Sequence, residues 1–214
     1  MSISQNVTPH ATTLSREQRW RELQARGATI WITGLPSSGK STLGAAIEER
    51  LVALGRGAYL LDGDNLRCGL CSDLAFARAD REENVRRVGE LARLFADSGT
   101  VAIAAVVSPY ARMRKHVRER HERDGLPFVE VFVDTPVKLC AERDPKGLYA
   151  RAYAGELDGF TGVDDPYEPP REPRLRITPE LALPRAVDAV LDLLGTPRLL
   201  GSSGATSAAA SSRR

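Results

Sequence analysis

The sequence predicts an α/β fold in which helices cover both faces of a parallel sheet. Short apolar runs alternate with segments of helical periodicity, and this alternation favours a parallel sheet. The runs are continuous, as in Ile30, Trp31 and Ile32, so neither face of the sheet is expected to meet water. A glycine-rich loop follows the first run directly and precedes an amphipathic helix. These three observations place one α/β domain between two irregular ends.

The expected elements follow from periodicity and from the residues that start and stop them. Strands are expected at residues 28–33, 58–61, 100–107, 128–133 and 175–177, and helices at 14–26, 40–54, 81–98, 137–143, 181–194 and from Pro109 onward. Asp80, followed by Glu83, predicts a capping box at the start of the helix 81–98. The apolar face of the helix 40–54 is formed by Leu43, Ile47, Leu51 and Leu54.

Length and composition limit the class of protein. The 214 residues are enough for one domain, which we expect over residues 14–194, with a disordered segment at 1–13 and a disordered Ser-, Ala- and Gly-rich tail at 195–214. Lys and Arg number 30 against 28 Asp and Glu, so bulk charge gives no case for a nucleic-acid partner. No apolar run approaches the roughly 20 residues of a membrane helix, and the three cysteines fit a reducing compartment. We therefore expect a cytoplasmic protein with no membrane partner.

The loop after the first strand matches a phosphate-binding motif. The pattern G-x-x-x-x-G-K-[ST], in a strand–loop–helix context, predicts a P-loop NTPase-type fold and nucleotide binding. Lys40 is expected to reach the β- and γ-phosphates, and the Ser41 hydroxyl to bind Mg²⁺. The motif alone leaves kinases, GTPases and ATPase motors open. Its expected nucleotide-binding residues are Gly34, Leu35, Pro36, Ser37, Ser38, Gly39, Lys40, Ser41 and Thr42.

Two aspartates, Asp62 and Asp64, follow the second expected strand, with Gly63 between them in a tight turn. One carboxylate could orient a hydroxyl nucleophile or accept its proton, and the other, with Asp62 the candidate, could hold Mg²⁺ through water. A plain surface turn is the alternative. The position of this pair at a strand end beside the phosphate loop favours the catalytic interpretation.

Seven segments, in order, resemble the adenylyl-sulfate (APS) kinases. They are residues 34–42 (GLPSSGKST), 61–67 (LDGDNLR), 80–84 (DREEN), 108–110 (SPY), 131–136 (VFVDTP), 144–149 (DPKGLY) and 159–167 (GFTGVDDPY). The resemblance implies an enzyme that transfers the γ-phosphoryl group of ATP to the ribose 3′-hydroxyl of APS with Mg²⁺, and a homodimer. The alternatives are another small-molecule P-loop kinase, or a nucleotide-binding regulatory module without catalysis.

The resemblance also implies roles for individual residues. Arg67, Arg81 and Asn84 correspond to residues that hold the phosphosulfate and ribose of APS, and Phe76 and Phe160 to aromatics that enclose its adenine. By residue type alone, the arginines could instead be solvated helix residues and Phe76 a core residue. Further implied contacts are Val107 and Ser108 with substrate, Arg143 with nucleotide, and Lys146, Gly147 and Leu148 at the start of a mobile segment. We expect Ser108 to position substrate and not to form a covalent intermediate.

Residues 144–174 are long for a loop in a compact domain, and such loops are usually functional or disordered. We expect a mobile lid that excludes water and carries Phe160 over the substrates.

Cys68 and Cys71 stand where the family commonly has His and Asn. A thiol switch beside the substrate site and an inert substitution are both open interpretations of that pair.

Overall fold

The computed structural model describes residues 8, 10 and 12–195. In chain order the elements are α1 (Arg16–Glu22), β1 (Ala28–Thr33), α2 (Lys40–Ala53), β2 (Ala58–Asp62), α3 (Gly63–Arg67), α4 (Arg78–Ser98), β3 (Val101–Ala105), α5 (Ala111–Arg123), β4 (Phe128–Val133), α6 (Val137–Arg143), α7 (Leu148–Tyr153), β5 (Leu175–Ile177) and α8 (Leu183–Leu193).

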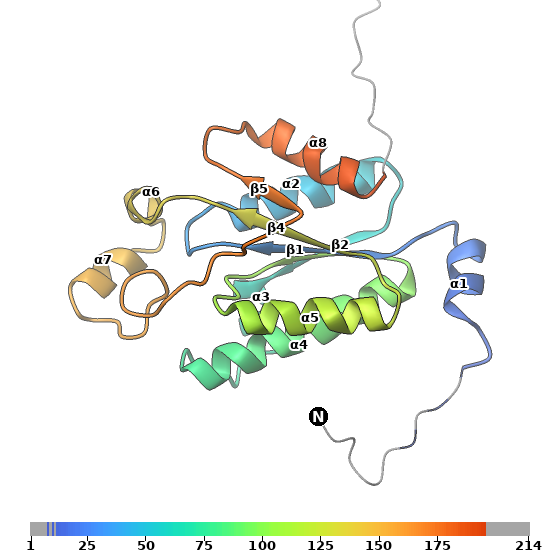
Figure 1. The fold of residues 1–214 in the computed structure, drawn as a ribbon, viewed down its shortest axis with the longest axis horizontal. Helices are drawn as coiled ribbons and strands as arrows, with labels where there is room; N and C mark the ends of the chain where they lie inside the picture. Colours follow the sequence, from blue (N-terminus) through green and yellow to red (C-terminus); the bar gives the residue numbers. More distant parts are fainter. Residues whose placement is uncertain (1–7, 9, 11, 196–214) are drawn as a thin grey trace, which may run out of the picture.

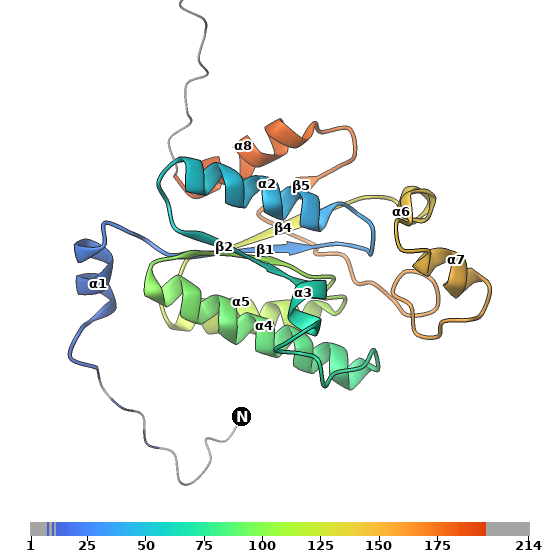
Figure 2. The same cartoon turned by 180° about the vertical axis from the view of Figure 1, so that it is seen from behind.

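The strands form one parallel sheet in the spatial order β2-β3-β1-β4-β5. Strand β1 pairs with β3 on one side and with β4 on the other, and all six of its residues are buried. Helices α2 and α8 cover one face of the sheet and α4 and α5 the other, while α6 and α7 lie beyond one end (Figure 1). Figure 2 shows the same layers from behind. The predicted α/β fold is confirmed.

Alternate residues of β1 pack into two separate hydrophobic layers. Ile30 and Ile32 join the layer that contains α2 and α8, whereas Trp31 joins the layer that contains α4. Side chains on both faces of the strand are removed from water, and each fully buried one stabilises the fold by about 1.5–3 kcal/mol. This two-sided burial explains the continuous apolar run in the sequence.

The predicted capping box of α4 is wrong. The helix begins at Arg78 with Ala77 as its N-cap, and no side chain caps it. Glu83 accepts hydrogen bonds from Arg86 and Arg87 on the following turn, so ion pairs at helical spacing occupy the carboxylate that the box requires. Asp80 instead lies in the first turn, where its charge favours the helix dipole.

Several predicted bounds are too long. Strand β3 ends at Ala105 because the chain then turns through Ser108, whose φ is 41°. Helix α5 begins at Ala111 with Tyr110 as its N-cap, two residues after the predicted start at Pro109. The structure also shortens the helices expected at 14–26 and 181–194 to α1 and α8. All of these differences lie at the ends of helices and strands, where sequence propensity determines the boundary least well.

Two short helices were not among the predicted elements. The tight turn predicted at Asp62, Gly63 and Asp64 is the start of α3, and Asp62 is its N-cap, accepting from the backbone N–H groups of Asp64 and Asn65 at 3.0 and 3.5 Å. Helix α7 interrupts the segment 144–174, which the sequence predicts as a long loop. Both helices have fewer than two turns, so they carry little periodic signal.

The disordered ends predicted at 1–13 and 195–214 lie outside the described residues, apart from residues 8, 10, 12, 13 and 195. Among the described residues, no helix is both long enough and apolar enough to cross a membrane.

The close approach of Gly27 to α4 gives a test of this packing. A Cβ at Gly27 would lie 1.9 Å from the carbonyl oxygen of Ala96, so the backbone must shift. We expect Gly27→Ala to lower the free energy of unfolding by about 1–3 kcal/mol in urea denaturation. Gly57→Ala is the matched control, because Gly57 also precedes a strand but its Cβ would meet only Thr100 Oγ1, at 3.9 Å. Equal losses in the two variants would contradict the packing argument.

Candidate active site

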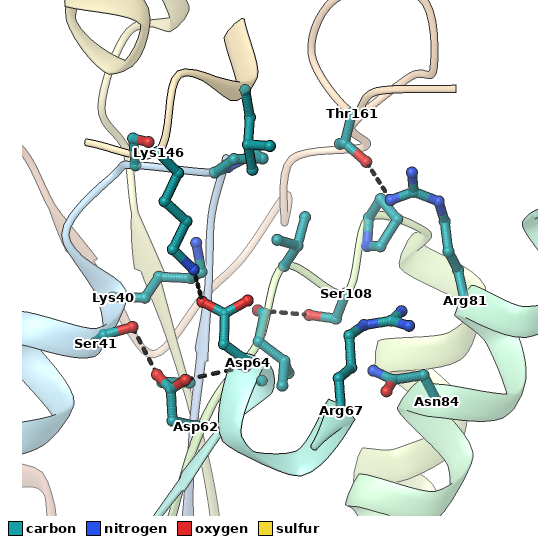
Figure 3. Close-up of a pocket in the computed structure, with 18 of the residues that line it drawn as sticks. Lys40, Ser41, Asp62, Asp64, Arg67, Arg81, Asn84, Ser108, Lys146 and Thr161 are labelled. Carbon is teal, nitrogen blue, oxygen red and sulfur yellow. Dashed lines mark hydrogen bonds and ion pairs between the residues drawn. The ribbon is translucent and has the colours of Figure 1, made fainter. Parts of the chain in front are cut away.

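A cleft of about 500 Å³ lies at the carboxyl-terminal edge of the sheet. Its walls come from the phosphate loop, the end of β2, helices α3 and α4, the segment after β3, and residues 143–161 (Figure 3). Ligand sites of parallel sheets are expected at this edge. The structure therefore brings together motifs that are spread over most of the chain.

The phosphate loop has the backbone that its glycines permit. Gly34 and Gly39 have φ values of 155° and 107°, and a Cβ at Gly34 would lie 2.6 Å from the carbonyl oxygen of Val133. Gly39 is the N-cap of α2 and no side chain caps that helix, so its first N–H groups remain available to a ligand. A helix N-terminus of this kind attracts anions.

Lys40 is buried at the base of the loop. Its Nζ donates to the carbonyl oxygen of Leu35 at 2.7 Å and to Ser38 Oγ at 3.5 Å. Burial disfavours the charged ammonium and lowers the pKa of Lys40 to about 8, although Asp62 and Asp64 act in the opposite direction. The hydrogen-bond acceptors of Lys40 are thus uncharged, and a phosphate group would supply an anionic one.

The two aspartates have different surroundings. Asp62 is buried at the end of β2, accepts a hydrogen bond from Ser41 Oγ at 2.6 Å, and caps α3 with its other oxygen. The carboxylate of Asp64 is exposed and forms an ion pair with Lys146 from the segment after α6. Figure 3 shows both carboxylates below the Lys146 side chain, with Lys40 alongside.

The Ser41–Asp62 pair fits a magnesium ion held jointly with a nucleotide. In the part of the chain that the structure describes, no group of three or more His, Cys, Asp or Glu side chains could hold a metal by itself. Mg²⁺ usually takes only one or two protein oxygens and completes its shell with phosphate and water. A hydroxyl and a carboxylate 2.6 Å apart beside the phosphate loop meet that requirement.

Arg67 and Arg81 carry positive charge that contacts neutral acceptors. Arg67 donates to the carbonyl oxygens of Leu74 and Ala75, at 3.0 and 3.1 Å. Its guanidinium carbon lies 4.3 Å from the centre of the Phe76 ring, and that of Arg81 lies 5.7 Å from the same centre. Burial and the neighbouring Arg81 charge both lower the pKa of Arg67. Among the described residues, no carboxylate forms an ion pair with either arginine, and two like charges brought together in this way favour an anionic ligand.

Asn84 has a buried acceptor with no partner. Its side chain lines the cleft from α4, is 8% exposed, and leaves Oδ1 without a hydrogen bond. An unmade hydrogen bond on a buried polar group costs about 1–3 kcal/mol. The position therefore indicates a ligand that donates a hydrogen bond, such as a sugar hydroxyl.

Arg81 also joins α4 to the segment 144–174. Its guanidinium donates to the carbonyl oxygen of Gly159 and, at 2.7 Å, to Thr161 Oγ1. Phe160 lies between these two acceptors in the chain, is buried, and packs edge-on against Tyr149 with ring centres 4.9 Å apart. The segment thus covers the cleft in this structure (Figure 3).

Ser108 lies at the floor of the cleft but is only 2% exposed. Its hydroxyl accepts from Trp31 Nε1 at 3.1 Å and contacts Thr33 Oγ1 at 3.0 Å. No carboxylate or histidine is among these partners. The geometry gives Ser108 a place in the cleft floor without activating it as a nucleophile.

A second hollow of about 180 Å³ lies on the other side of the phosphate loop. Arg143 borders both spaces and donates to the carbonyl oxygen of Ser38 at 3.3 Å. Thr178 and Pro179, which follow β5, also line the second hollow. These two were missed by the sequence patterns, although a strand end in a parallel sheet is itself a signal for a ligand contact.

The structure brings most of the predicted site residues to the main cleft. Gly34, Leu35, Ser38 and Gly147 do not line it; the first three shape the phosphate loop, and Gly147 is the N-cap of α7. Thr161 and Pro109 line the cleft without having been predicted. Of the cysteine pair, Cys68 is exposed, whereas burial hides Cys71 and raises its pKa, which disfavours the reactive thiolate.

Comparison with known proteins identifies the family. Residues 26–178 match the family model described as adenylylsulphate kinase. The adenylyl-sulfate kinase of Citrobacter koseri is 50% identical over 190 residues, which cover 89% of this chain and 94% of that protein. The chain belongs to the adenylylsulphate kinase family. The Penicillium chrysogenum adenylyl-sulfate kinase is 48% identical over 202 residues, covering 91% and 96% of the two chains.

A solved structure supports the same assignment. The Mycobacterium tuberculosis APS kinase, determined in complex with AMPPNP and APS, matches with a TM-score of 0.78 at 48% identity. The match covers 80% of this chain and 99% of that one. The family predicted from the seven sequence segments is thus confirmed.

The burial of Lys40 predicts proton uptake when nucleotide binds. Because its pKa in the free protein is about 8, Lys40 is half protonated at pH 8, and phosphate raises that pKa again. Calorimetry of ADP binding at pH 8 in buffers of different ionisation enthalpy should show uptake of about half a proton. Uptake should vanish near pH 6.5, where Lys40 is already charged, and affinity should fall as pH rises through 8.

Lys40→Met is the control for this measurement, since it has no proton to gain. Uptake that persists in Lys40→Met, or uptake that is absent in the unaltered protein at pH 8, would contradict the assignment to Lys40.

Proposed function

We propose that this protein transfers the γ-phosphoryl group of ATP to the ribose 3′-hydroxyl of adenylyl sulfate, giving 3′-phosphoadenylyl sulfate and ADP. The observation that carries the proposal is that the two ends of the main cleft carry different groups. A phosphate loop with two aspartates forms one end. Arg67 and Arg81, the Phe76 ring and the unpartnered Oδ1 of Asn84 form the other. Family membership supports the same activity.

The acceptor end of the cleft suits a sulfated nucleotide. A phosphosulfate has adjacent anionic oxygens, to which guanidinium groups such as Arg67 and Arg81 donate paired hydrogen bonds. Phe76, which is 58% exposed, and Phe160 offer ring surfaces to a base, and such stacking contributes about 1–3 kcal/mol per base. Asn84 Oδ1 can accept a hydrogen bond from a ribose hydroxyl. Val107 and Leu148 complete the apolar lining.

The second hollow suits the base and ribose of ATP. It shares Gly39, Thr42 and Arg143 with the main cleft, so a nucleotide seated there directs its phosphates through the loop toward the acceptor. The planar guanidinium of Arg143 can stack on a purine ring. Two hollows joined across one phosphate loop are what direct transfer between two nucleotides requires.

Phosphoryl transfer then depends mainly on alignment and charge. The loop N–H groups and Lys40 hold the phosphates, and Lys40 stabilises the charge that develops on them. Ser41 and, through water, Asp62 would hold Mg²⁺ that arrives with ATP, and the ion would supply positive charge to offset that of the phosphates. The bond from the 3′-oxygen to the γ-phosphorus forms as the bond to the β,γ-bridging oxygen breaks, and ADP leaves.

Asp64 is the better candidate for the proton of the 3′-hydroxyl. Both oxygens of Asp62 already accept hydrogen bonds, from Ser41 and from two backbone N–H groups. Asp64 is exposed in the cleft and forms an ion pair with Lys146 of the segment 144–174. Ser108 contributes by shaping the floor of the cleft, where its hydroxyl contacts Trp31 and Thr33.

The lid, the homodimer and the cytoplasmic location belong to the same proposal. Arg81, Phe160 and Thr161 support a closing role for residues 144–174, since they join that segment to the acceptor side. The homodimer rests on the sequence resemblance, and the cytoplasmic location rests on composition.

A coupled assay of ADP release tests the proposal directly. With ATP and Mg²⁺ present, we expect turnover with APS and at least about 100-fold less with AMP or gluconate, because neither offers the phosphosulfate to Arg67 and Arg81. The product should carry the new phosphate at the 3′ position, as read by ³¹P NMR. Turnover with gluconate but not with APS would replace the substrate assignment with that of another small-molecule kinase.

Substitution of Asn84 should weaken APS binding and at the same time stabilise the ligand-free protein. We expect Asn84→Leu to raise the KM for APS by roughly tenfold, because the acceptor for the ribose hydroxyl is lost. Removing the unpartnered amide should also raise Tm by about 2 °C or more in the ligand-free protein. Asn65→Leu, the same change at an exposed position of α3, is the control and should change neither quantity. A lower Tm together with an unchanged KM in Asn84→Leu would exclude the ligand role.

A further inference from the structure

Arg114 of α5 is a buried charge that the proposed chemistry does not use. Its side chain is 2% exposed and forms an ion pair of 3.0 Å with Glu130 of β4, which is 3% exposed. A buried pair of this kind rarely stabilises a fold more than apolar side chains of similar volume. The other contacts of the guanidinium therefore decide what Arg114 does.

Those contacts join two distant segments. Arg114 Nη1 donates to the carbonyl oxygen of Ser108 at 2.6 Å, and Nη2 donates to the carbonyl oxygen of Glu168 at 2.5 Å. Ser108 follows β3 at the floor of the cleft, and Glu168 lies where the segment 144–174 returns to the sheet. Because the guanidinium fork is planar and rigid, it holds both carbonyls in one fixed relation.

The Ser108 end of this connection is a strained turn. Ser108 has a φ of 41°, a backbone angle that residues other than glycine seldom adopt. Its neighbours Val107 and Pro109 line the cleft, so the direction of this turn sets the shape of the acceptor side. A backbone held in such a conformation depends on the contacts around it.

The Glu168 end is the C-terminal anchor of the lid. Glu168 N–H donates to the carbonyl oxygen of Pro109 at 2.9 Å, and its carboxylate accepts from Ala111 N–H at 2.7 Å. The preceding Tyr167 has its hydroxyl 2.9 Å from Thr33 Oγ1, and its ring centre lies 5.7 Å from the Arg114 guanidinium carbon. These contacts fix the returning lid to the segment after β3, to the end of β1 and to α5.

We propose that Arg114 is a positioning residue that locks the lid anchor to the Ser108 turn and thereby places Phe160 and Thr161 over the acceptor substrate. Arg114 does not line the cleft, so it acts through these two segments. The nucleotide end depends on α2 and the phosphate loop, which Arg114 does not touch. Loss of the fork should therefore affect acceptor binding far more than ATP binding. The kinetic part of this inference rests on the proposed function.

Arg114→Lys against Arg118→Lys is the matched experiment. Both arginines lie on α5 and pair with Glu130, but only Arg114 reaches Ser108 and Glu168. Lysine keeps the charge and cannot hold two carbonyls in a planar fork. In Arg114→Lys we expect the KM for APS to rise roughly tenfold or more, since a misplacement of about 1 Å can cost up to 100-fold. The KM for ATP should stay within about twofold, and Arg118→Lys should match the unaltered protein.

Amide hydrogen exchange provides a readout that does not require turnover. Backbone amides of residues 156–168 should exchange faster in Arg114→Lys, and those of β1 and α2 should not. Glu130→Gln is the control for stability, because it weakens the same buried pair without touching the lid. If wild-type protein does not turn over APS, the proposed function fails, and exchange at the lid still decides the role of Arg114.

Three results would overturn the proposal: equal increases in both KM values, lid exchange at the wild-type rate, or the same KM shift in Glu130→Gln. Should Arg114→Lys fail to fold, Arg114→Gln takes its place, because one side-chain amide cannot donate to both carbonyl oxygens as the planar fork does. The expected split between the two KM values and the faster lid exchange are the same for that variant, and their absence would reject the proposal.

Discussion

The parallel direction of all five strands is the constraint on which the site depends. Each strand delivers its carboxyl end to the same edge of the sheet. The phosphate loop follows β1, Asp62 ends β2, Ser108 follows β3, and Thr178 follows β5. Because β1 is buried on both faces and central, the phosphate loop is fixed in the middle of this edge. Nucleotide and acceptor can then approach it from opposite sides, as the two hollows indicate.

Features that depend on neighbouring residues alone could be predicted from the sequence. The phosphate loop is one, because its glycines, its lysine and the following helix are contiguous. Strands β1, β4 and β5 and helix α6 have their predicted bounds, since each run has a clear stop on both sides. The start of α4 could not be fixed in this way. There the charge pattern offers Glu83 both a capping role and ion pairs with Arg86 and Arg87, and only the folded helix shows which prevails.

Features that depend on contacts between distant segments could not be predicted. Thr161 carries no signal until Arg81 is placed 2.7 Å from it. In the sequence, Arg114 cannot be told from the other basic residues of α5. Its burial against Glu130, which distinguishes it, is visible only in the folded structure. The unpartnered Asn84 acceptor is likewise a property of the packed cleft. The family resemblance supplied Asn84 and Arg81, but it did not supply the geometry from which their partners can be argued.

The positive charge of the cleft is preserved because its basic side chains donate hydrogen bonds to uncharged oxygens. Carbonyl oxygens orient Arg67 and Arg81 without cancelling their charge, and Lys40 is held in the same way. The ion pair Asp64–Lys146 crosses the cleft with both side chains exposed, and exposed pairs contribute about 1 kcal/mol or less. An incoming phosphosulfate or triphosphate can therefore displace this pair at small cost, and it meets Arg67, Arg81 and Lys40, which donate hydrogen bonds to uncharged oxygens. Carboxylate partners for the arginines would stabilise the empty site, and binding would then have to break those pairs before it gained anything.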